Sequence, residues 1–458
     1  MITRKPCSLT RNGTKLSAVA ALLLASSFFA TNEARALPSY AQQTGMPCSQ
    51  CHTIAFGPAL TSYGRQFKLN AYTFGDAEHV VPFALMVVTG YSHTATDLPE
   101  APAPHFANNN NVAVNEVTGF FAGRITEHSG AFIEAAYSGV ERHTAWGAVD
   151  LRYARALTIG GKGVVAGISI NNNPTVTDLW NSTPVWSFPY TGSDLAPSPG
   201  AAPVLFDGIS ERVLGPTVYA MINDRLYLEA GAYKSMSDRW LSNVGLTADD
   251  NLHMDGLAPY WRAVLQFEHG PSYYSIGIVG LDVKLRPDPT VAATDHYRDL
   301  GMDATYQYTD GGKYAIQANL SYVHEKRSLG ASFAAEASDA VDNHLDSLHF
   351  DAGFAWDQTW VASVGWFNTS GSSNSALFTP AEVEGSATGS PDSRGYTIQL
   401  EYVAFGKIHS FLRPWLNLRL GLQYIGYNRF NGGNTNYDGF GRSASDNNTL
   451  FGFAWVAF

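Results

Sequence analysis

Two cysteines and a histidine near the N-terminus have the types and spacing to do chemistry. Cys48, Cys51 and His52 form a C-x-x-C-H motif, the pattern of c-type haem attachment. Two thiols three positions apart can reach the two vinyl groups on one edge of a porphyrin, and the next imidazole then lies under the iron. The motif therefore predicts one covalent haem c, with thioether bonds at Cys48 and Cys51 and with His52 as the proximal metal ligand.

Two other kinds of site use paired cysteines, and both fit this motif less well. A zinc site needs two further ligands at comparable spacing, and no second C-x-x-C motif or histidine pair follows. A redox-active dithiol does not require a histidine after its second cysteine. The chain has three cysteines in 458 residues, which also excludes a disulfide scaffold.

The first 36 residues have the pattern of a secretory signal peptide. A basic start precedes an apolar stretch of 15 residues, 16–30, and residues 34–36 form an A-x-A cleavage site. This stretch is shorter than the roughly 20 residues that a membrane-spanning helix needs. We expect export and cleavage, which agrees with haem attachment because thioether bonds to haem form outside the cytoplasm.

Residues 37–79 are predicted to form a small haem-bearing segment with one short helix at 61–69. So short a segment needs a cofactor or a partner surface to be stable. Its apolar side chains either cover the macrocycle or fill a small core: Phe56, Leu60, Tyr63, Phe67 and Tyr72. Arg65 or Lys68 is placed to bind a haem propionate through a charge-assisted hydrogen bond.

The distal haem ligand stays open at the level of sequence. His79 stands just before the first expected strand, and Met86 points inward by the alternation of that strand. A sixth position without a protein ligand is the third alternative. The choice matters because methionine and histidine together raise the reduction potential of haem.

From residue 80 to 458 the chain has the alternation of β-strands, with apolar residues at every second position. The clearest apolar sets are 416, 418, 420, 422 and 424, and 314, 316, 318, 320 and 322. About sixteen antiparallel strands are expected, with fourteen or eighteen as alternatives. They are placed at 80–94, 112–126, 129–140, 144–158, 162–171, 214–223, 225–235, 258–269, 272–284, 296–309, 312–325, 344–357, 359–369, 393–405, 412–428 and 445–458.

The connections between these strands distinguish a membrane barrel from a soluble sandwich. Turns after even-numbered strands are tight, whereas most connections after odd-numbered strands are long and polar, as at 172–213 and 370–392. Outer-membrane barrels have this asymmetry, with the short turns in the periplasm. We therefore expect an all-β transmembrane barrel in the cell outer membrane, with both termini on the periplasmic side and the haem segment as a plug in the lumen.

The barrel prediction assigns a place to the polar and aromatic residues. Tryptophan and tyrosine near strand ends are expected to anchor the barrel at the membrane interfaces. Polar residues on the other face of the strands are expected in the lumen: Asp150, Arg152, Glu229, Arg262, Glu268, Asp351, Glu401 and Arg419.

Composition and charge exclude several other classes. The chain is 13% aromatic and 15% charged, unlike disordered chains or coiled coils. Its net charge is −11, and it becomes −15 when residues 1–36, with five basic residues and one acidic residue, are removed. No basic patch for phosphates is evident in the sequence, so nucleic acid is not an expected partner.

The N-terminal motifs resemble one family over the whole mature chain. The run LPSYAQQTGMPCSQCH at 37–52, followed by Pro58, Leu60-Thr61 and GRQFKL at 64–69, resembles the fused monohaem cytochrome–porins of iron-oxidising bacteria. That resemblance implies thioether bonds at Cys48 and Cys51 and proximal ligation by His52. Two positions depart from the family pattern: Gln42 stands where a basic residue is expected, and Ala71 where glycine is usual.

The resemblance implies an electron-transfer oxidoreductase that takes electrons from extracellular Fe(II) and passes them to a periplasmic cytochrome or similar carrier. Since the apolar band of the membrane is about 25 Å tall, a single haem must be reachable from both sides, inside the lumen. Two alternatives remain. One is a transport porin with haem in a structural role, and the other is a haem protein that acts on a small molecule, as a peroxidase does.

Overall fold

The computed structural model describes residues 37–54, 57–75, 82–183, 188–206, 208–246, 253–310, 313–407, 409–410, 412 and 416–458. The predicted signal peptide at 1–36, Phe56 and the candidate ligand His79 lie outside these residues. The division of the chain at residues 36 and 79 therefore stays a prediction.

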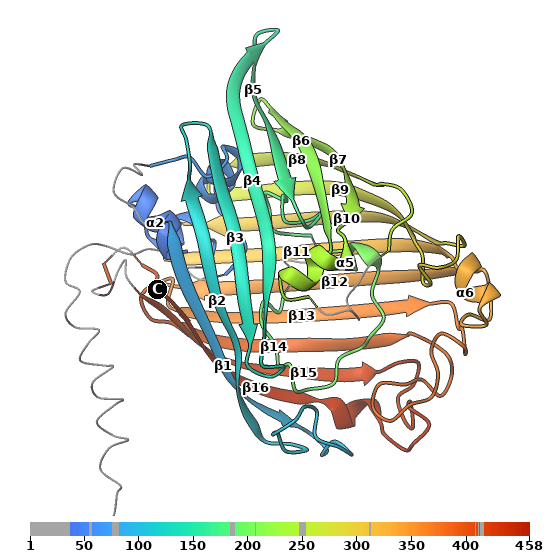
Figure 1. Ribbon diagram of the computed structural model, residues 1–458. Coiled ribbons are helices and arrows are strands. Elements are labelled where there is room, and N and C mark those ends of the chain that lie inside the picture. The colour runs from blue at the N-terminus through green and yellow to red at the C-terminus, as the bar shows by residue number, and fades with distance from the viewer. Residues whose placement is uncertain are drawn as a thin grey trace, which may run out of the picture. The chain divides into compact units, whose positions relative to one another are not determined.

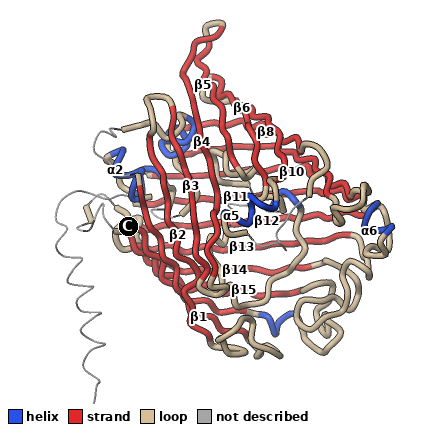
Figure 2. The backbone as a smooth tube through the Cα atoms, in the orientation of Figure 1, coloured by secondary structure: helices blue, strands red, loops and turns tan. Residues whose placement is uncertain are grey.

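Sixteen antiparallel strands form a closed barrel, which confirms the predicted fold class. Each strand pairs with its neighbours in the chain, and β1 closes the barrel on β16, with Met86 opposite Ala457. Figures 1 and 2 show the strands running around one wall. The strands are β1 Phe83–Thr94, β2 Asn111–Arg124, β3 Ser129–Ser138, β4 His143–Ile159, β5 Lys162–Asn171, β6 Val213–Ile222, β7 Leu226–Ser235, β8 Ala258–His269, β9 Ser272–Leu285, β10 Asp295–Thr309, β11 Tyr314–Ser328, β12 Asp342–Trp356, β13 Trp360–Gly371, β14 Ser393–Val403, β15 Asn417–Arg429 and β16 Thr449–Ala457.

Most strand ends agree with the sequence to within three residues, and the last two strands start later than predicted. β15 begins at Asn417 instead of residue 412, and β16 begins at Thr449 instead of residue 445. Before β16 the chain forms a short 3-10 helix, η4 (Ala444–Asn447). Ser443 and Asp446 form a capping box there, and this local hydrogen bonding competes with extended structure.

The two faces of the barrel wall differ in polarity as predicted. Apolar side chains such as Leu228, Leu400 and Leu422 are exposed on the outside. Charged side chains such as Arg152 and Arg262 are buried inside. A closed barrel satisfies its backbone hydrogen bonds within its own wall, so this apolar exterior fits the hydrocarbon of a membrane. Among the helices in the described residues, none is long and apolar enough to cross a membrane.

Among the residues that the structure describes before the barrel, three short helices are present: α2 (Pro38–Thr44), α3 (Cys48–Cys51) and α4 (Ser62–Leu69). Proline opens α2 and Gly45, with φ 73°, ends it. The predicted helix at 61–69 is α4, with Thr61 as its N-cap. In Figure 1, α2 lies near the end of the barrel that carries the C-terminus, and α6 (Gly330–Ala334) lies at the opposite end.

Candidate haem-binding site

The C-x-x-C-H motif is held by close packing of α3 against α4. The His52 N–H donates to the Cys48 carbonyl at 2.9 Å, and the Thr61 N–H donates to the Cys51 carbonyl at 2.9 Å. A Cβ atom on Gly64 would lie 2.2 Å from the Cys51 carbonyl oxygen, so only glycine permits this approach of the two helices. Both cysteines are free thiols, and no disulfide joins them.

A cavity of about 390 Å³ lies next to this motif inside the barrel. Its size is within the range of about 300–1,000 Å³ that is usual for ligand and cofactor sites. Cys51 and His52 line it from the N-terminal segment, and Met86 and Trp455 line it from the wall. Most of the other lining is apolar, including Leu37, Tyr40, Leu60, Phe67, Tyr72, Val88, Phe120, Phe132 and Val176.

The residues around the cavity fit the haem that the motif predicts. The Nδ1 atom of His52 is buried and has no hydrogen-bond partner among the described residues. Burial lowers the pKa of His52 to about 4, so the imidazole is neutral, the form that binds a metal. The Sγ atom of Cys48 is next to the wall, where it accepts a hydrogen bond from Asn417 Nδ2 at 3.3 Å. An apolar cavity with a thiol and a neutral imidazole at one edge suits a covalently held macrocycle.

Met86 points into the lumen, as its predicted phase in β1 requires, and shares the cavity with His52. The indole Nε1–H of Trp455 donates to the Met86 sulfur at 3.4 Å. Trp455 therefore does not have the membrane-anchoring role expected for tryptophans near strand ends. The alternation of the last strand contained the signal, because its apolar set at 450, 452, 454, 456 and 458 leaves residue 455 facing inward.

Neither basic residue proposed for a haem propionate has its charge free for that role. Arg65 does not line the cavity. Its guanidinium group donates to the Leu60 carbonyl at 2.6 Å and to Gln307 at 2.8 Å, and it lies 3.6 Å from the centre of the Tyr273 ring. Lys68 lines the cavity, but its Nζ donates to the Asp178 carbonyl at 2.6 Å and to Asn181 at 2.8 Å. Both side chains therefore fix the N-terminal segment to its surroundings.

Ala71, which stands where glycine is usual in the family that the sequence resembles, has an unfavourable backbone conformation. Ala71 has φ 56° and is fully buried. This left-handed conformation is unfavourable for alanine by roughly 1–2 kcal/mol and free of that penalty for glycine. Glycine would adopt this conformation without strain, whereas this chain holds an alanine in it.

The N-terminal segment contacts the wall around its circumference at the short-turn end. Gln43 accepts from the Arg124 N–H at 2.7 Å beside β2, and Tyr72 donates to Asp150 of β4 at 2.6 Å. Farther around the wall, the Ser49 N–H donates to the Gly406 carbonyl, between β14 and β15, at 3.3 Å. The segment therefore lies inside the lumen against the wall, and we call it the plug.

A second layer comes from the connection between β5 and β6, residues 172–212. Residues 172–183 are buried throughout, although their polar composition resembles an exposed loop. Arg262 of β8 lies 3.3 Å from Asp178, and Arg262 binds Asp303 of β10 at 2.7 Å. Burial alone would raise the pKa of Asp178, but Arg262 and Lys68 hold it below its usual value. Asp178 is therefore held as a carboxylate among buried cations, and its contacts fix this loop in the lumen.

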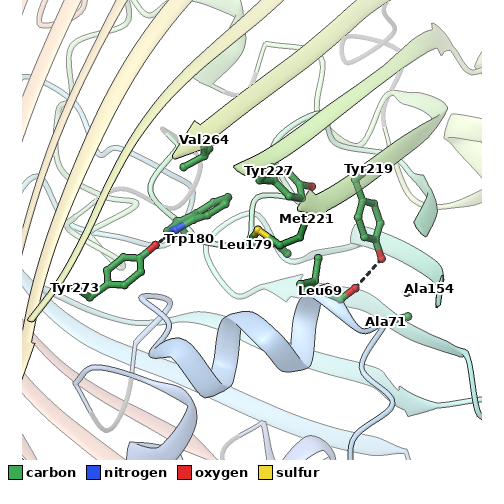
Figure 3. Packing of buried hydrophobic residues seen from close by; sticks show 10 residues of the cluster. All are labelled: Leu69, Ala71, Ala154, Leu179, Trp180, Tyr219, Met221, Tyr227, Val264 and Tyr273. Carbon is green, nitrogen blue, oxygen red and sulfur yellow. Dashed lines mark hydrogen bonds between the residues drawn. The ribbon is translucent and has the colours of Figure 1, made fainter. Parts of the chain in front are cut away.

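The loop continues across the lumen to the far wall. Thr191 accepts from Gln423 of β15 at 2.9 Å, and the Leu205 N–H donates to Asp299 of β10 at 2.6 Å. Figure 3 shows where loop, plug and wall meet: Tyr219 donates to the Leu69 carbonyl at 3.0 Å, and Trp180 donates to Tyr273. The cavity thus lies between two layers, with Val176, Asn181, Pro189 and Tyr190 lining it from the loop.

Most of the residues predicted for the lumen are buried there. Arg419 pairs with Glu401, and Asp150 pairs with Arg152 at 2.5 Å. Glu268 differs, because its side chain is 57% exposed at the rim, 3.7 Å from Arg65 of the plug. Glu116 and Glu134 were not selected from the sequence, yet both line the cavity.

The buried ammonium group of Lys68 makes docking of the plug depend on pH. Burial, and then Arg152, lowers its pKa from 10.5 to about 7. When α4 is released from the wall, the Lys68 ammonium group keeps its proton up to about pH 10. The docked state therefore gains stability as pH rises above about 7, and the docking equilibrium constant increases by at most about tenfold per pH unit. Hydrogen-exchange protection factors of α4 are expected to rise between pH 7 and 9 in the wild type, and Lys68→Met should remove this rise. An equal rise in the protection factors of Lys68→Met would contradict the role of Lys68 in this pH dependence. Loss of the rise in the exposed control Lys162→Met would contradict it as well.

Solved structures similar to this chain are outer-membrane porins. OprB from Pseudomonas putida matches with a TM-score of 0.46 at 12% identity, over 82% of this chain and 94% of the porin. An anion-selective porin from Comamonas acidovorans has a TM-score of 0.43 at 12% identity, over 82% of this chain and 98% of that porin. The channel DcaP of Acinetobacter baumannii has a TM-score of 0.43 at 11% identity, over 82% of this chain and 96% of that channel. No protein-family model and no curated protein sequence matches the chain. These likenesses do not bear on haem, so the functional argument rests on the site itself.

Proposed function

We propose that this protein is an outer-membrane c-type cytochrome that transfers electrons from an extracellular donor, Fe(II), to a periplasmic carrier. The observation that carries the proposal is that one cavity within the lumen is lined by Cys51, His52 and Met86. Cys48 and Cys51 would hold the haem covalently, and His52 and Met86 would be the ligands of its iron. The group supplies a one-electron redox centre, which neither the plug nor the wall provides otherwise.

The two layers across the lumen favour electron transfer over solute transport. A solute must pass both the plug and the loop at 172–212, and both are fixed by buried hydrogen bonds and ion pairs. An electron needs only a redox centre between the two layers. The cavity is lined by residues of both the loop and the plug, so a haem held there would contact both layers. For each Fe(II) oxidised outside, one electron reduces the periplasmic carrier.

The net negative charge of the chain supports a cationic donor. The net charge is −11 for the whole chain and −15 without residues 1–36. Negative potential along an approach path raises the local concentration of cations and speeds their association.

Electron transfer across a vesicle membrane tests this function. The protein is placed in vesicles that enclose an oxidised soluble cytochrome c, and Fe(II) is added outside without oxygen. We expect the enclosed cytochrome to be reduced with the wild type and not with the haem-free Cys51→Ser variant. Equal reduction with Cys51→Ser would mean that Fe(II) enters through the lumen, which would support the transport-porin alternative. No reduction with the wild type would exclude Fe(II) as donor or this direction of transfer.

Replacing Met86 tests the sixth ligand. Since a thioether ligand raises the haem potential, Met86→Ala is expected to lower it by on the order of 100 mV, within the ~0.8 V range that axial ligands control. The visible spectrum of the reduced protein should change with it. Met302→Ala, on the outward face of β10, is the matched control and should change neither. An unchanged potential and spectrum in Met86→Ala would remove Met86 as a ligand.

A further inference from the structure

A charged patch lies on the outer face of the barrel at its long-loop end. The register of β9–β12 aligns four outward residues in one row: Asp282, Arg298, Lys326 and His344. The next row toward the loops contains Lys284, His296, Ser328 and Asp342. We call the basic side chains on this face the rim patch, which comprises Lys284, His296, Arg298, His324, Lys326 and His344.

The three permanent cations of the rim patch are available to a ligand. Lys284, Arg298 and Lys326 are exposed, and their side chains make no hydrogen bond or ion pair with any residue in the described part of the chain. The nearby carboxylates have partners of their own. Asp282 pairs with His296 at 2.7 Å, and Asp346 pairs with His324 at 2.8 Å.

The rim patch begins where the lipid-facing surface ends. Leu300 and Met302 are 53% and 52% exposed on the outer face of β10. They are the first and second outward residues after Arg298 in the direction away from the long loops. On β11, Tyr322 marks the interface, and its hydroxyl donates to Asp346 at 2.5 Å. His324 and Lys326 follow at the next two outward positions of this strand.

The patch is specific to one side of the barrel. Among the described residues of β13–β16, the corresponding outward positions at the long-loop end carry two cations, Arg394 and its register partner Arg429, and Arg429 pairs with Asp392 at 2.7 Å. On β7 the only such cation is Lys234, and β8 has none. A merely solvated rim would not require the cations of β9, β10 and β11 to gather in adjacent rows.

We propose that the rim patch binds the phosphate groups of lipid A, the phosphorylated glycolipid of the outer leaflet of the outer membrane. Its phosphates lie at the boundary between acyl chains and water, the level that these rows occupy. Arginine binds phosphate through parallel hydrogen bonds, and lysine adds point charges at the same depth. Each basic side chain near an anionic membrane surface adds to lipid affinity. The site rests on the outer-membrane location of the barrel and is independent of the haem.

Binding of defined lipids to the full-length holoprotein tests the proposal. Native mass spectrometry in detergent compares bis-phosphorylated lipid A, the same lipid after removal of its phosphates, and phosphatidylglycerol. Lys284→Gln/Arg298→Gln/Lys326→Gln is expected to weaken binding of bis-phosphorylated lipid A by on the order of tenfold or more. The wild type should lose a similar factor with the dephosphorylated lipid.

A matched triple variant removes three other exposed cations near the same end of the barrel: Lys234→Gln/Arg239→Gln/Arg394→Gln. It should bind lipid A as the wild type does, which separates the patch from total charge. Equal losses in both triple variants would overturn the proposal, as would unchanged binding in the rim-patch variant. Equally tight, patch-dependent binding of phosphatidylglycerol would replace lipid A by any anionic lipid. Heat-modifiable migration on gels confirms that each variant holds a folded barrel.

Discussion

Replacing Cys51 by serine is expected to leave a folded barrel without stable haem. The Cys51 thiol lines the cavity beside His52, whereas Cys48 faces Asn417 of the wall. With one thioether bond lost, the remaining attachment depends on Cys48 and on axial ligation alone. We expect the haem content of the purified protein, measured as a pyridine haemochrome, to fall by on the order of tenfold or more, and the α band to shift because one vinyl group stays unmodified.

Gln50→Ala is the matched control, because this residue lies within the motif and supplies no haem ligand. It should retain full haem content on a denaturing gel stained for haem. The barrel itself should survive in Cys51→Ser, since all sixteen strands close without any cysteine in the wall. Normal haem content in Cys51→Ser would show that the motif does not attach haem.

The lumen is expected to conduct ions freely only when both layers are removed. In planar bilayers we expect the wild type to carry at least about tenfold less current than a double variant, because plugged barrels lack the water-filled channel of open porins. The double variant begins its mature chain at Phe83 and replaces residues 174–183 by a short Gly-Ser linker. Its loss of the plug and of the Asp178–Arg262 contact should leave an open polar lumen.

Each single variant serves as the control for the other layer. Removing only the loop segment leaves the plug with its contacts from Gln43, Ser49 and Tyr72 to the wall. Removing only the plug leaves the loop bound to Arg262 and Gln423. Both should conduct much less than the double variant. A wild-type conductance equal to that of the double variant would contradict the closed lumen and favour solute transport.

The strands of the wall could be predicted from the sequence because the pattern that identifies each strand lies within that strand. An apolar residue at every second position marks the lipid-facing side, and a strand shifted by one residue would turn that face inward. This is why Met86, Arg152 and Arg419 face inward as predicted. Where local hydrogen bonding competes, as at the capping box of Ser443 and Asp446, the strand start was wrong by a few residues.

The interior of the barrel was predicted less well because its contacts join distant parts of the chain. Residues 172–183 are polar and resemble a surface loop, but Arg262 and Lys68 supply partners inside the lumen. The contacts of Arg65 with Gln307 and Tyr273 were missed for the same reason, because both residues are far from Arg65 in sequence. The pairing of Met86 with Trp455 follows from closure of the barrel, which no local pattern contains.

An anaerobic visible spectrum of the purified, detergent-held protein, before and after addition of Fe(II), tests the central claim most directly. Covalent haem c is first confirmed in the same sample. We expect prompt growth of the reduced α band when Fe(II) is added. If dithionite reduces the haem and Fe(II) does not, iron is not the donor, and the electron-transfer function proposed here for Fe(II) is contradicted.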